Sequence, residues 1–461
     1  MSHPAPSRRH SILKSAEAPL RWLVFGMGKT GLSCVRFLTE QGHAVLVVDT
    51  REEPPQMLEL KQQWPGIECR NGSLDPGILA NIDAVVLSPG IALDHPLVVV
   101  ARNAGIPIVG DVELFARVAP SPYIAITGSN GKSTVTTLVT QIIAAASLSV
   151  RAGANLGTPA LDLLRPPMPA YFVLELSSFQ LEVTESLAAE VACVLNISPD
   201  HLDRHGTLEA YAAAKARILR NARAVVLNAD DPLIAGWAPR DIPVRWISLH
   251  HVRPDCYSVA TRDGQRYLVH GDQVLLPSAS LQIKGAHNEF NALSAMAIAD
   301  SLGISREIQN AVLASFVGLE HRCHLVAEHA GVSWFNDSKG TNVGASAAAI
   351  AGIFHDRTGV LIAGGQGKGA DFTALRPALR ARVHSVILIG EDAPKIAAAV
   401  ADLVQVHRAS TMQEAVDCAR VYARPGEAVL LSPACASFDM FQNYEARGRA
   451  FEAAVREMIQ Q

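Results

Sequence analysis

The chain has 461 residues, a length typical of about three domains, and 49% of them are hydrophobic, which is enough to bury sizeable cores. Its formal net charge of −4 excludes the basic excess that DNA- and RNA-binding proteins usually carry. No run of about 18 apolar residues is present, so we expect no membrane insertion. The seven cysteines include no C-x-x-C pair, which argues against a zinc ribbon and favours a reducing compartment, the cytoplasm.

Short apolar runs recur along the chain after a polar and basic N-terminal segment. We expect residues 1–21 to form a loose tail and not a signal peptide, because no apolar segment follows the basic residues. Short Val/Ile/Leu-rich runs that alternate with helical patterns are typical of parallel sheets buried on both faces, so the fold class is α/β. The expected strands are residues 22–26, 44–49, 83–90, 123–128, 171–176, 191–196, 224–228, 359–365, 385–390 and 428–433.

These strands fall into three series, which indicate three domains with mainly parallel sheets. The first series occupies residues 22–111 and the second residues 112–318. The second contains a region of short β candidates at 244–283 and a helix expected at about 288–302. The third series occupies residues 319–461.

The first glycine-rich loop is Gly26-Met-Gly28-Lys-Thr-Gly31, between an expected strand and helix. Gly26 permits a tight turn, Gly28 lets a phosphate approach the backbone, and Gly31 allows the helix to pack closely on the strand. Asp49 ends the next strand, where a dehydrogenase would bind a ribose. By itself this pattern leaves three interpretations open: a dinucleotide site, a site for another nucleotide, and a purely structural turn.

The second loop, GSNGKST at residues 128–134, gives a stronger signal. It follows the strand YIAIT and opens a helix, so backbone N–H groups and the helix N-terminus favour phosphate there. Lys132 would reach the outer phosphates and Ser133 could bind Mg²⁺. A third loop, GGQGKG at 364–369, is a weaker signal, and its spacing leaves an anion site and a plain turn equally open.

Polar residues follow two further strands of the second series. Glu175 ends one strand, and the segment Asn196–His205 follows the next. Asp200 or Asp203 can be read as a helix cap and His205 as solvated surface, but His201 should meet Lys132 and Glu175 in one crevice at the strand ends. Lys215 lies in the alanine-rich helix YAAAKAR, and its composition predicts a solvated surface lysine.

Together these motifs resemble the Mur ligases, and most closely the member of that family that adds glutamate. The resemblance runs from about residue 22 to the C-terminus. Single motifs are shared across the Mur ligases and with folylpolyglutamate synthetases, whereas the ordered set ending in SPACASFD is specific for the glutamate-adding member. The motifs are GSNGKST (128–134), LELSSFQLE (174–182), NISPDHLDRHG (196–206), YAAAKARI (211–218), KGAHNEFNAL (284–293), HR (321–322), NDSKGTN (336–342) and LSPACASFDMF (431–441).

The resemblance implies an ATP-dependent ligase that joins UDP-N-acetylmuramoyl-L-alanine to D-glutamate through an acyl phosphate, in peptidoglycan precursor synthesis. It implies a Rossmann-like N-terminal domain for the UDP moiety, a P-loop-type ATPase domain in the centre, and a Rossmann-like C-terminal domain for glutamate. Its partners would be small molecules, and we expect a monomer. The alternatives are a Mur ligase that adds another amino acid or L-glutamate, and, less closely, a folylpolyglutamate synthetase.

The resemblance also assigns residues to each ligand. The UDP-substrate set is Lys29, Thr30, Asp49, Thr50, Arg51, Ser88, Gly90 and Asn155. The ATP set is Gly128, Ser129, Asn130, Gly131, Lys132, Ser133, Thr134, Asn288, Asn291, Arg322 and Asp337. The glutamate set is Thr341, Lys368, Ser437 and Tyr444.

Finally, the resemblance reverses the interpretation of Lys215, which matches a lysine that the family carries as a carbamate. A carbamate formed from CO₂ replaces a positive charge by a negative one and offers hard oxygen ligands to Mg²⁺. His201 and this carbamate would share one Mg²⁺, and Ser133 and Glu175 would hold a second. The catalytic set implied is Lys132, Glu175, His201, Lys215 and Arg322.

Overall fold

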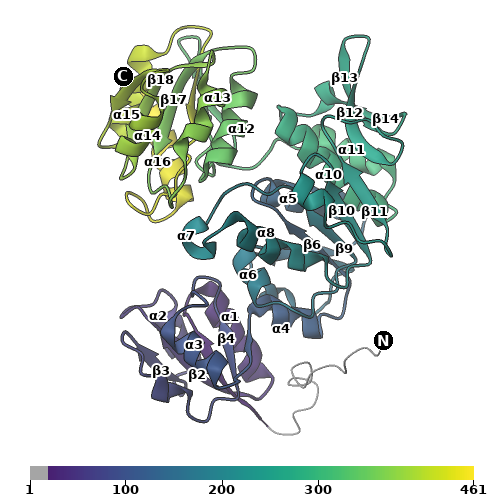
Figure 1. Cartoon of the computed structure of the whole chain (residues 1–461), viewed down its shortest axis with the longest axis vertical. Helices are drawn as coiled ribbons and strands as arrows, with labels where there is room; N and C mark the ends of the chain where they lie inside the picture. Colours follow the sequence, from purple (N-terminus) through teal and green to yellow (C-terminus); the bar gives the residue numbers. More distant parts are fainter. Residues whose placement is uncertain (1–18, 461) are drawn as a thin grey trace.

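The computed structural model describes residues 19–460 and contains three sheets, one after another along the chain. The α/β class with mainly parallel sheets is confirmed; the N-terminal part lies at one end of the long axis, and the C-terminal part lies beside the upper half of the central part (Figure 1). Residues 1–18 of the expected tail lie outside the described residues, and the first strand begins at Arg21. None of the helices described between residues 19 and 460 combines the length and the apolar character that a membrane-spanning segment requires.

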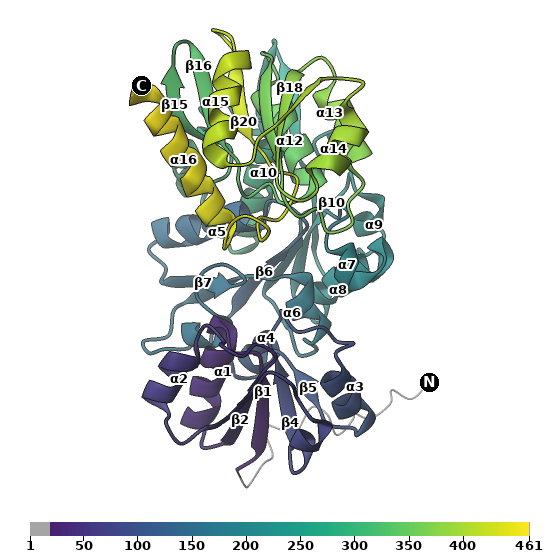
Figure 2. The ribbon, with the colours of Figure 1, turned by 90° about the vertical axis from the view of Figure 1, so that its left-hand side faces the viewer.

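The N-terminal sheet is fully parallel, with strand order β3-β2-β1-β4-β5. Its helices α1 and α2 cover one face and α3 the other (Figure 2). The strand order reverses between β1 and β4, where a parallel sheet leaves a crevice beyond its carboxyl ends. The elements are β1 (Arg21–Phe25), α1 (Lys29–Glu40), β2 (Ala44–Asp49), α2 (Met57–Gln63), β3 (Glu68–Asn71), β4 (Ala84–Leu87), α3 (Pro96–Asn103) and β5 (Ile108–Val109).

The central sheet has nine strands in the order β14-β13-β12-β11-β10-β9-β6-β8-β7. The strands from β7 to β12 are parallel, and β13 and β14 extend the edge as antiparallel strands. The strands are β6 (Tyr123–Thr127), β7 (Val150–Ala154), β8 (Tyr171–Glu175), β9 (Val191–Val194), β10 (Ala224–Asn228), β11 (Val244–Ile247), β12 (Cys256–Arg262), β13 (Gln265–His270) and β14 (Gln273–Pro277). The α-helices are α4 (Asp111–Val118), α5 (Lys132–Ala145), α6 (Ser178–Glu182), α7 (Leu202–His205), α8 (Leu208–Ala216), α9 (Pro232–Ala235), α10 (Ala286–Ser301) and α11 (Arg306–Ser315), and the short helix η3 is Ala160–Leu163.

The C-terminal sheet has six strands in the order β15-β16-β20-β17-β18-β19, and only the edge pair β15–β16 is antiparallel. Helices α12, α13 and α14 pack on one face and α15 and α16 on the other. The strands are β15 (His324–His329), β16 (Val332–Asn336), β17 (Gly359–Gly364), β18 (Val383–Ile389), β19 (Gln405–Arg408) and β20 (Ala428–Leu431). The helices are α12 (Val343–Ile353), α13 (Arg376–Leu379), α14 (Ala393–Val400), α15 (Met412–Tyr422) and α16 (Tyr444–Gln460).

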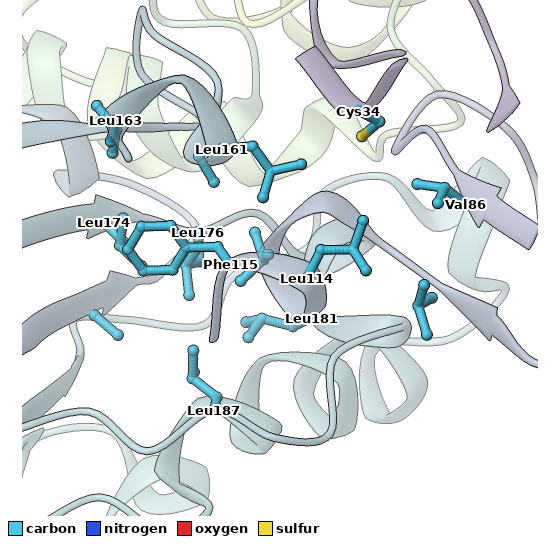
Figure 3. Packing of buried hydrophobic residues seen from close by; sticks show 14 of the residues in the cluster. Cys34, Val86, Leu114, Phe115, Leu161, Leu163, Leu174, Leu176, Leu181 and Leu187 are labelled. Carbon is cyan, nitrogen blue, oxygen red and sulfur yellow. The ribbon is translucent and has the colours of Figure 1, made fainter. Parts of the chain in front are cut away.

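One hydrophobic cluster joins the N-terminal and central parts. Figure 3 shows Cys34 of α1 and Val86 of β4 in the same cluster as Leu114 and Phe115 of α4 and Leu174 of β8. The Phe115 ring meets the rings of Tyr123 and Phe172 edge-on, with centroids 5.7 and 5.2 Å away. Because one closely packed core spans both parts, the crevice of the N-terminal sheet is held against the central sheet.

Candidate active site

The first candidate site is a cleft of about 610 Å³ at the crevice between β1 and β4. All eight residues of the expected UDP-substrate set line it. Asn155, from the loop after β7, brings the central domain into its wall. The cleft is also lined by Gly26, Gly28, Pro89, Ile91, Ala154, Gly157, Pro159 and Gln180.

Close backbone contacts explain the glycines of the first loop. Gly26 has φ +99°, a conformation that L side chains rarely adopt. A Cβ at Gly31 would lie 1.9 Å from the Gly26 carbonyl oxygen, so helix α1 could not approach the loop with any side chain there. Ser88, after β4, donates its hydroxyl to the same Gly26 oxygen at 2.9 Å. The loops after β1 and β4 are thus tied together.

The carboxylate of Asp49 holds neighbouring parts of the cleft in place. Its carboxylate is 1% exposed, and it accepts hydrogen bonds from Met27 N at 2.6 Å and from Arg51 N, Nε and Nη2 at 2.7–2.9 Å. Burial by itself would raise the pKa of Asp49, but the hydrogen bonds from Arg51 and Met27 outweigh it and lower the pKa. Asp49 therefore stays ionised and holds both Arg51 and the loop after β1 in place.

The second candidate site begins at the phosphate loop, between β6 and α5. Gly131 precedes the helix in the left-handed conformation at φ +84°, and a Cβ there would lie 2.5 Å from the Asn291 side chain. Lys132 donates to the carbonyl oxygens of Gly128 at 2.8 Å and Ser129 at 2.9 Å. A cavity of about 350 Å³ beside the loop is lined by seven residues of the expected ATP set: Asn130, Gly131, Thr134, Asn288, Asn291, Arg322 and Asp337.

The C-terminal domain completes this cavity. Arg322 Nη2 donates to the hydroxyl of Ser133 at 2.8 Å, across the boundary between the C-terminal and central sheets. Asp337 follows β16 and is buried, and it accepts hydrogen bonds from the Ser432 hydroxyl at 2.7 Å and from Cys323 N at 3.2 Å. Burial raises the pKa of Asp337 to about 6, although Ser432 and Arg322 lower it in part.

Strand register brings the expected acid and histidine to the phosphate loop. Glu175 pairs with Ile126 in the sheet, and Val194 pairs with Thr127, so both neighbouring strands end beside Gly128. Glu175 is 3% exposed; its Oε1 accepts a hydrogen bond from Asn155 Nδ2 at 2.7 Å, and its Oε2 is buried without a hydrogen-bond partner among residues 19–460. A buried carboxylate oxygen left unpaired is costly, which makes Glu175 suited to a cation.

His201 stands at the start of α7 with φ +54°. Burial lowers the pKa of His201 to about 4, although Asp200 raises it in part, so the imidazole is neutral near pH 7. Neutral imidazole is the form that binds metals. Its ring meets the ring of Phe179 edge-on at 4.9 Å.

Two of the interpretations made from composition are wrong. Lys215 is 1% exposed, and its ammonium donates to the Gly128 carbonyl at 2.9 Å and to the Thr127 hydroxyl at 3.4 Å. The spacing of four residues puts Tyr211 and Lys215 on one face of α8, and this face packs inward beneath the phosphate loop. The side chain of His205 is also only 2% exposed, and it contacts Ser178 at 2.9 Å and Glu182 at 3.3 Å.

The expected glutamate set lies in the C-terminal domain, and one of its members, Lys368, contacts the central domain. Lys368 forms an ion pair with Asp200 at 3.0 Å, and the side chain of Asn342 donates to the other Asp200 oxygen at 2.9 Å. Ser437 is buried in the loop after β20, which pairs with the 364–369 loop through the Gln366–Ala436 bridge. Thr341 lies beside Asn342, and Tyr444 begins α16.

Three further residues of the site were assigned no ligand-binding role from the sequence. Lys339 lines the nucleotide cavity, its ammonium lies 3.7 Å from the centre of the Tyr444 ring, and burial lowers its pKa to about 8. Asp200 and Asn342 join the two domains as described above. Lys339 and Asn342 both belong to the NDSKGTN motif, which was the available signal, but motif membership alone does not separate Lys339 from its neighbours.

No group of three or more His, Cys, Asp or Glu side chains within residues 19–460 could hold a metal ion. Only Glu175 and His201 of the expected metal set are of these types; the other two members of that set are Ser133 and Lys215.

Comparison with known proteins covers most of the chain. Family models match residues 21–110 as the N-terminal domain of MurD-like Mur ligases, 126–299 as the Mur ligase middle domain and 321–435 as the Mur ligase glutamate ligase domain. The UDP-N-acetylmuramoylalanine–D-glutamate ligase of Nitrosococcus oceani is 48% identical over 95% of this chain and 96% of its own. The protein of that name from Pseudomonas fluorescens is 49% identical over 95% of this chain and 98% of its own.

Solved structures share the fold at lower sequence identity. The UDP-N-acetylmuramate-alanine ligase of Thermotoga maritima has a TM-score of 0.61 at 18% identity, and covers 95% of this chain and 100% of its own. A MurF ligase from Thermotoga maritima, solved in complex with ADP, has a TM-score of 0.60 at 15% identity, with 96% of each chain covered. With a matching family model in each of the three parts of the chain and relatives near 50% identity along its length, this chain belongs to the Mur ligase family.

Proposed function

We propose that this chain is an ATP-dependent ligase that forms the amide bond between UDP-N-acetylmuramoyl-L-alanine and D-glutamate in peptidoglycan precursor synthesis. The main support is the contact between Arg322 and Ser133, which joins the C-terminal domain to the phosphate loop. Glu175, His201 and Lys215 lie beside the same loop. The name of relatives 48–49% identical over 95% of the chain supports this choice of substrates.

Positive charge at the phosphate loop suits the first chemical step. The terminal carboxylate of the UDP-substrate attacks the γ-phosphorus of ATP, its bond to the β–γ bridging oxygen breaks, and an acyl phosphate and ADP result. Two anions must meet in this step, so charge stabilisation is the main requirement. Lys132, Arg322 and the N-terminus of α5 supply it. In the second step the amine of glutamate attacks the acyl carbon, and phosphate leaves.

The residues present fit Mg²⁺ as a further source of charge. Glu175 offers an unpaired buried carboxylate oxygen, His201 a neutral imidazole, and Ser133 a hydroxyl at the start of α5. Mg²⁺ bound by these residues would neutralise phosphate charge during transfer. We propose two ions, one at Ser133 and Glu175 and one at His201 and Lys215.

The surroundings of Lys215 support its modification to a carbamate. Its ammonium is buried among other cations, since Lys132 donates to the same Gly128 carbonyl. Burial, and then the charge of Lys132, hold the pKa of Lys215 well below its usual range, so a free amine is available to attack CO₂. The product, a negative carbamate, would relieve this repulsion and supply oxygen ligands.

The two sites suggest a path for the UDP-substrate. We place its UDP end in the cleft between β1 and β4 and its alanine carboxylate at the phosphate loop. Asn155 supports this path, because it lines the cleft and also donates to Glu175. Glutamate would enter from the C-terminal domain, beside Thr341, Lys368, Ser437 and Tyr444. This division of labour corresponds to proposed domains at residues 22–111, 112–318 and 319–461.

We also propose that the enzyme acts in the cytoplasm as a monomer. All seven cysteines are free thiols, which suits a reducing compartment.

The proposal predicts that phosphate release requires ATP, Mg²⁺, UDP-N-acetylmuramoyl-L-alanine and D-glutamate together. The physical reason is that ATP, the UDP-substrate and glutamate are held by different domains that meet at one phosphate loop. An omission series with a phosphate assay checks this, with the complete mixture as the reference. Equal phosphate release without the UDP-substrate, or faster release with a folate substrate, would contradict the proposed reaction.

A further inference from the structure

Arg204 connects the two sites, which lie on different sheets. It belongs to α7, the short helix that begins just after His201. Its Nη2 donates to the Ile91 carbonyl at 2.8 Å, and its Nη1 lies 3.4 Å from the Pro89 carbonyl. Both carbonyls belong to the loop after β4 in the N-terminal sheet, so one guanidinium spans the boundary between the two domains.

The loop that Arg204 holds is a wall of the first cleft. Ser88, Pro89, Gly90 and Ile91 all line that cleft. The Ser88 hydroxyl donates to Gly26 of the glycine-rich loop at 2.9 Å. A shift of this loop would therefore change the cleft at both of the strand ends that form it.

On its other side Arg204 contacts the surroundings of His201. Its guanidinium lies over the Phe179 ring at 4.7 Å and within 3.4 Å of Glu182. Phe179 is stacked with His205 at 5.3 Å and meets His201 edge-on at 4.9 Å. The Arg204 side chain is 16% exposed, and an arginine held at this burial by two carbonyls, a carboxylate and a ring has little freedom to move.

We propose that Arg204 is a positioning residue that fixes the UDP-binding loop 88–91 relative to His201, so that the substrate carboxylate lies at the phosphate loop. This inference rests on the proposed function and deepens it. Arg204 contacts no residue of the expected ATP set and none of the expected glutamate set. Its loss should therefore disturb the alignment of the UDP-substrate and leave the binding of ATP and glutamate intact.

Arg36 offers a matched control. It also joins the N-terminal part to the central part, through an ion pair between Arg36 of α1 and Asp162 of η3 at 2.5 Å, with a similar exposure of 21%. It lines neither the cleft nor the nucleotide cavity. If Arg204 merely held two domains together, Arg204→Met and Arg36→Met should lower kcat by similar factors.

Steady-state kinetics of the full chain distinguish these roles. We expect Arg204→Met to lower kcat roughly 100-fold, because misplacement of a reacting group by about 1 Å can have this effect, while the KM for ATP and for glutamate stays within about threefold. Arg204→Lys, which keeps the charge but cannot bridge two carbonyls, should recover only part of the rate. A kcat for Arg204→Met no lower than that of Arg36→Met would overturn the inference.

A second readout needs no turnover. Hydrogen exchange of the chain with UDP alone should reveal protection of residues 88–91 and also of 201–206 in the unchanged protein and in Arg36→Met. In Arg204→Met we expect the protection of 88–91 to persist and that of 201–206 to disappear. If 201–206 is protected equally in Arg204→Met, Arg204 does not connect the sites. If UDP protects neither segment of the unchanged protein, the proposed UDP site itself is wrong.

Discussion

Replacing Lys132 by alanine is expected to lower the rate of acyl-phosphate formation by about 10³-fold or more, while the UDP-substrate still binds. Lys132 is held by two carbonyl oxygens of the phosphate loop, where its charge would meet the transferred phosphoryl group. Lys132 does not line the UDP cleft, whose walls come mostly from the N-terminal sheet, so the geometry of the cleft should not depend on Lys132. Rapid-quench measurement of acyl phosphate, with calorimetry of UDP-substrate binding, checks both halves of the prediction.

Lys29→Ala is the matched control, because Lys29 occupies the first glycine-rich loop and lines the UDP cleft. It should weaken binding of the UDP-substrate and leave ATP binding unchanged, which is the reverse of the effect of Lys132→Ala. Loss of UDP-substrate binding in Lys132→Ala would contradict the assignment of the two loops to two ligands.

The second large effect is expected at Lys215. If Lys215 is a carbamate that binds Mg²⁺, Lys215→Ala should lose several kcal/mol of transition-state stabilisation, or about 10³-fold in kcat. Acetate should restore part of the rate, because a small carboxylate can replace the missing oxygens in the space that the side chain leaves. Lys215→Arg should remain inactive, with or without acetate, since it retains a positive charge beside Lys132.

Controls separate this chemistry from a loss of folding. Lys61→Ala, on the exposed surface of α2, should change the free energy of unfolding by less than about 0.5 kcal/mol and leave the rate unchanged. Nuclear magnetic resonance of the protein in isotopically labelled bicarbonate should detect a carbamate that disappears in Lys215→Arg. Normal turnover of both Lys215 variants in carbonate-depleted buffer would exclude the carbamate.

The strands and the main loops could be predicted because their signals are local. All ten expected strands are present, and the helix expected at about 288–302 is α10 at Ala286–Ser301. Short Val/Ile/Leu runs are typical of buried parallel strands, and GSNGKST carries its own turn and helix start. The edge strands β3, β7 and β19 were not predicted. They are partly exposed and contain polar residues such as Glu68, Arg151 and Gln405, which interrupt the apolar pattern.

Residues whose role depends on packing between distant segments could not be predicted from composition. Lys215 is buried because α8 packs beneath the phosphate loop, and alanines on that helix conceal which face turns inward. The roles of His205 and Arg204 could not be predicted for the same reason. The partners of His205, Ser178 and Glu182, and the partner of Arg204, Ile91, lie far away in the sequence. The role expected for Lys215 came from the resemblance to a family, whereas the role proposed for Arg204 rests only on its contacts in the structure.

We expect glutamate to be the amino acid that is joined to the UDP-substrate at this phosphate loop. The most direct measurement is a screen of amino acids with ATP, Mg²⁺ and UDP-N-acetylmuramoyl-L-alanine, in which phosphate release and the mass of the nucleotide product are followed together. We predict that D-glutamate gives by far the fastest release and a product heavier by one glutamyl residue. Faster turnover with L-glutamate, L-lysine or another amino acid, with the corresponding product mass, would contradict the account.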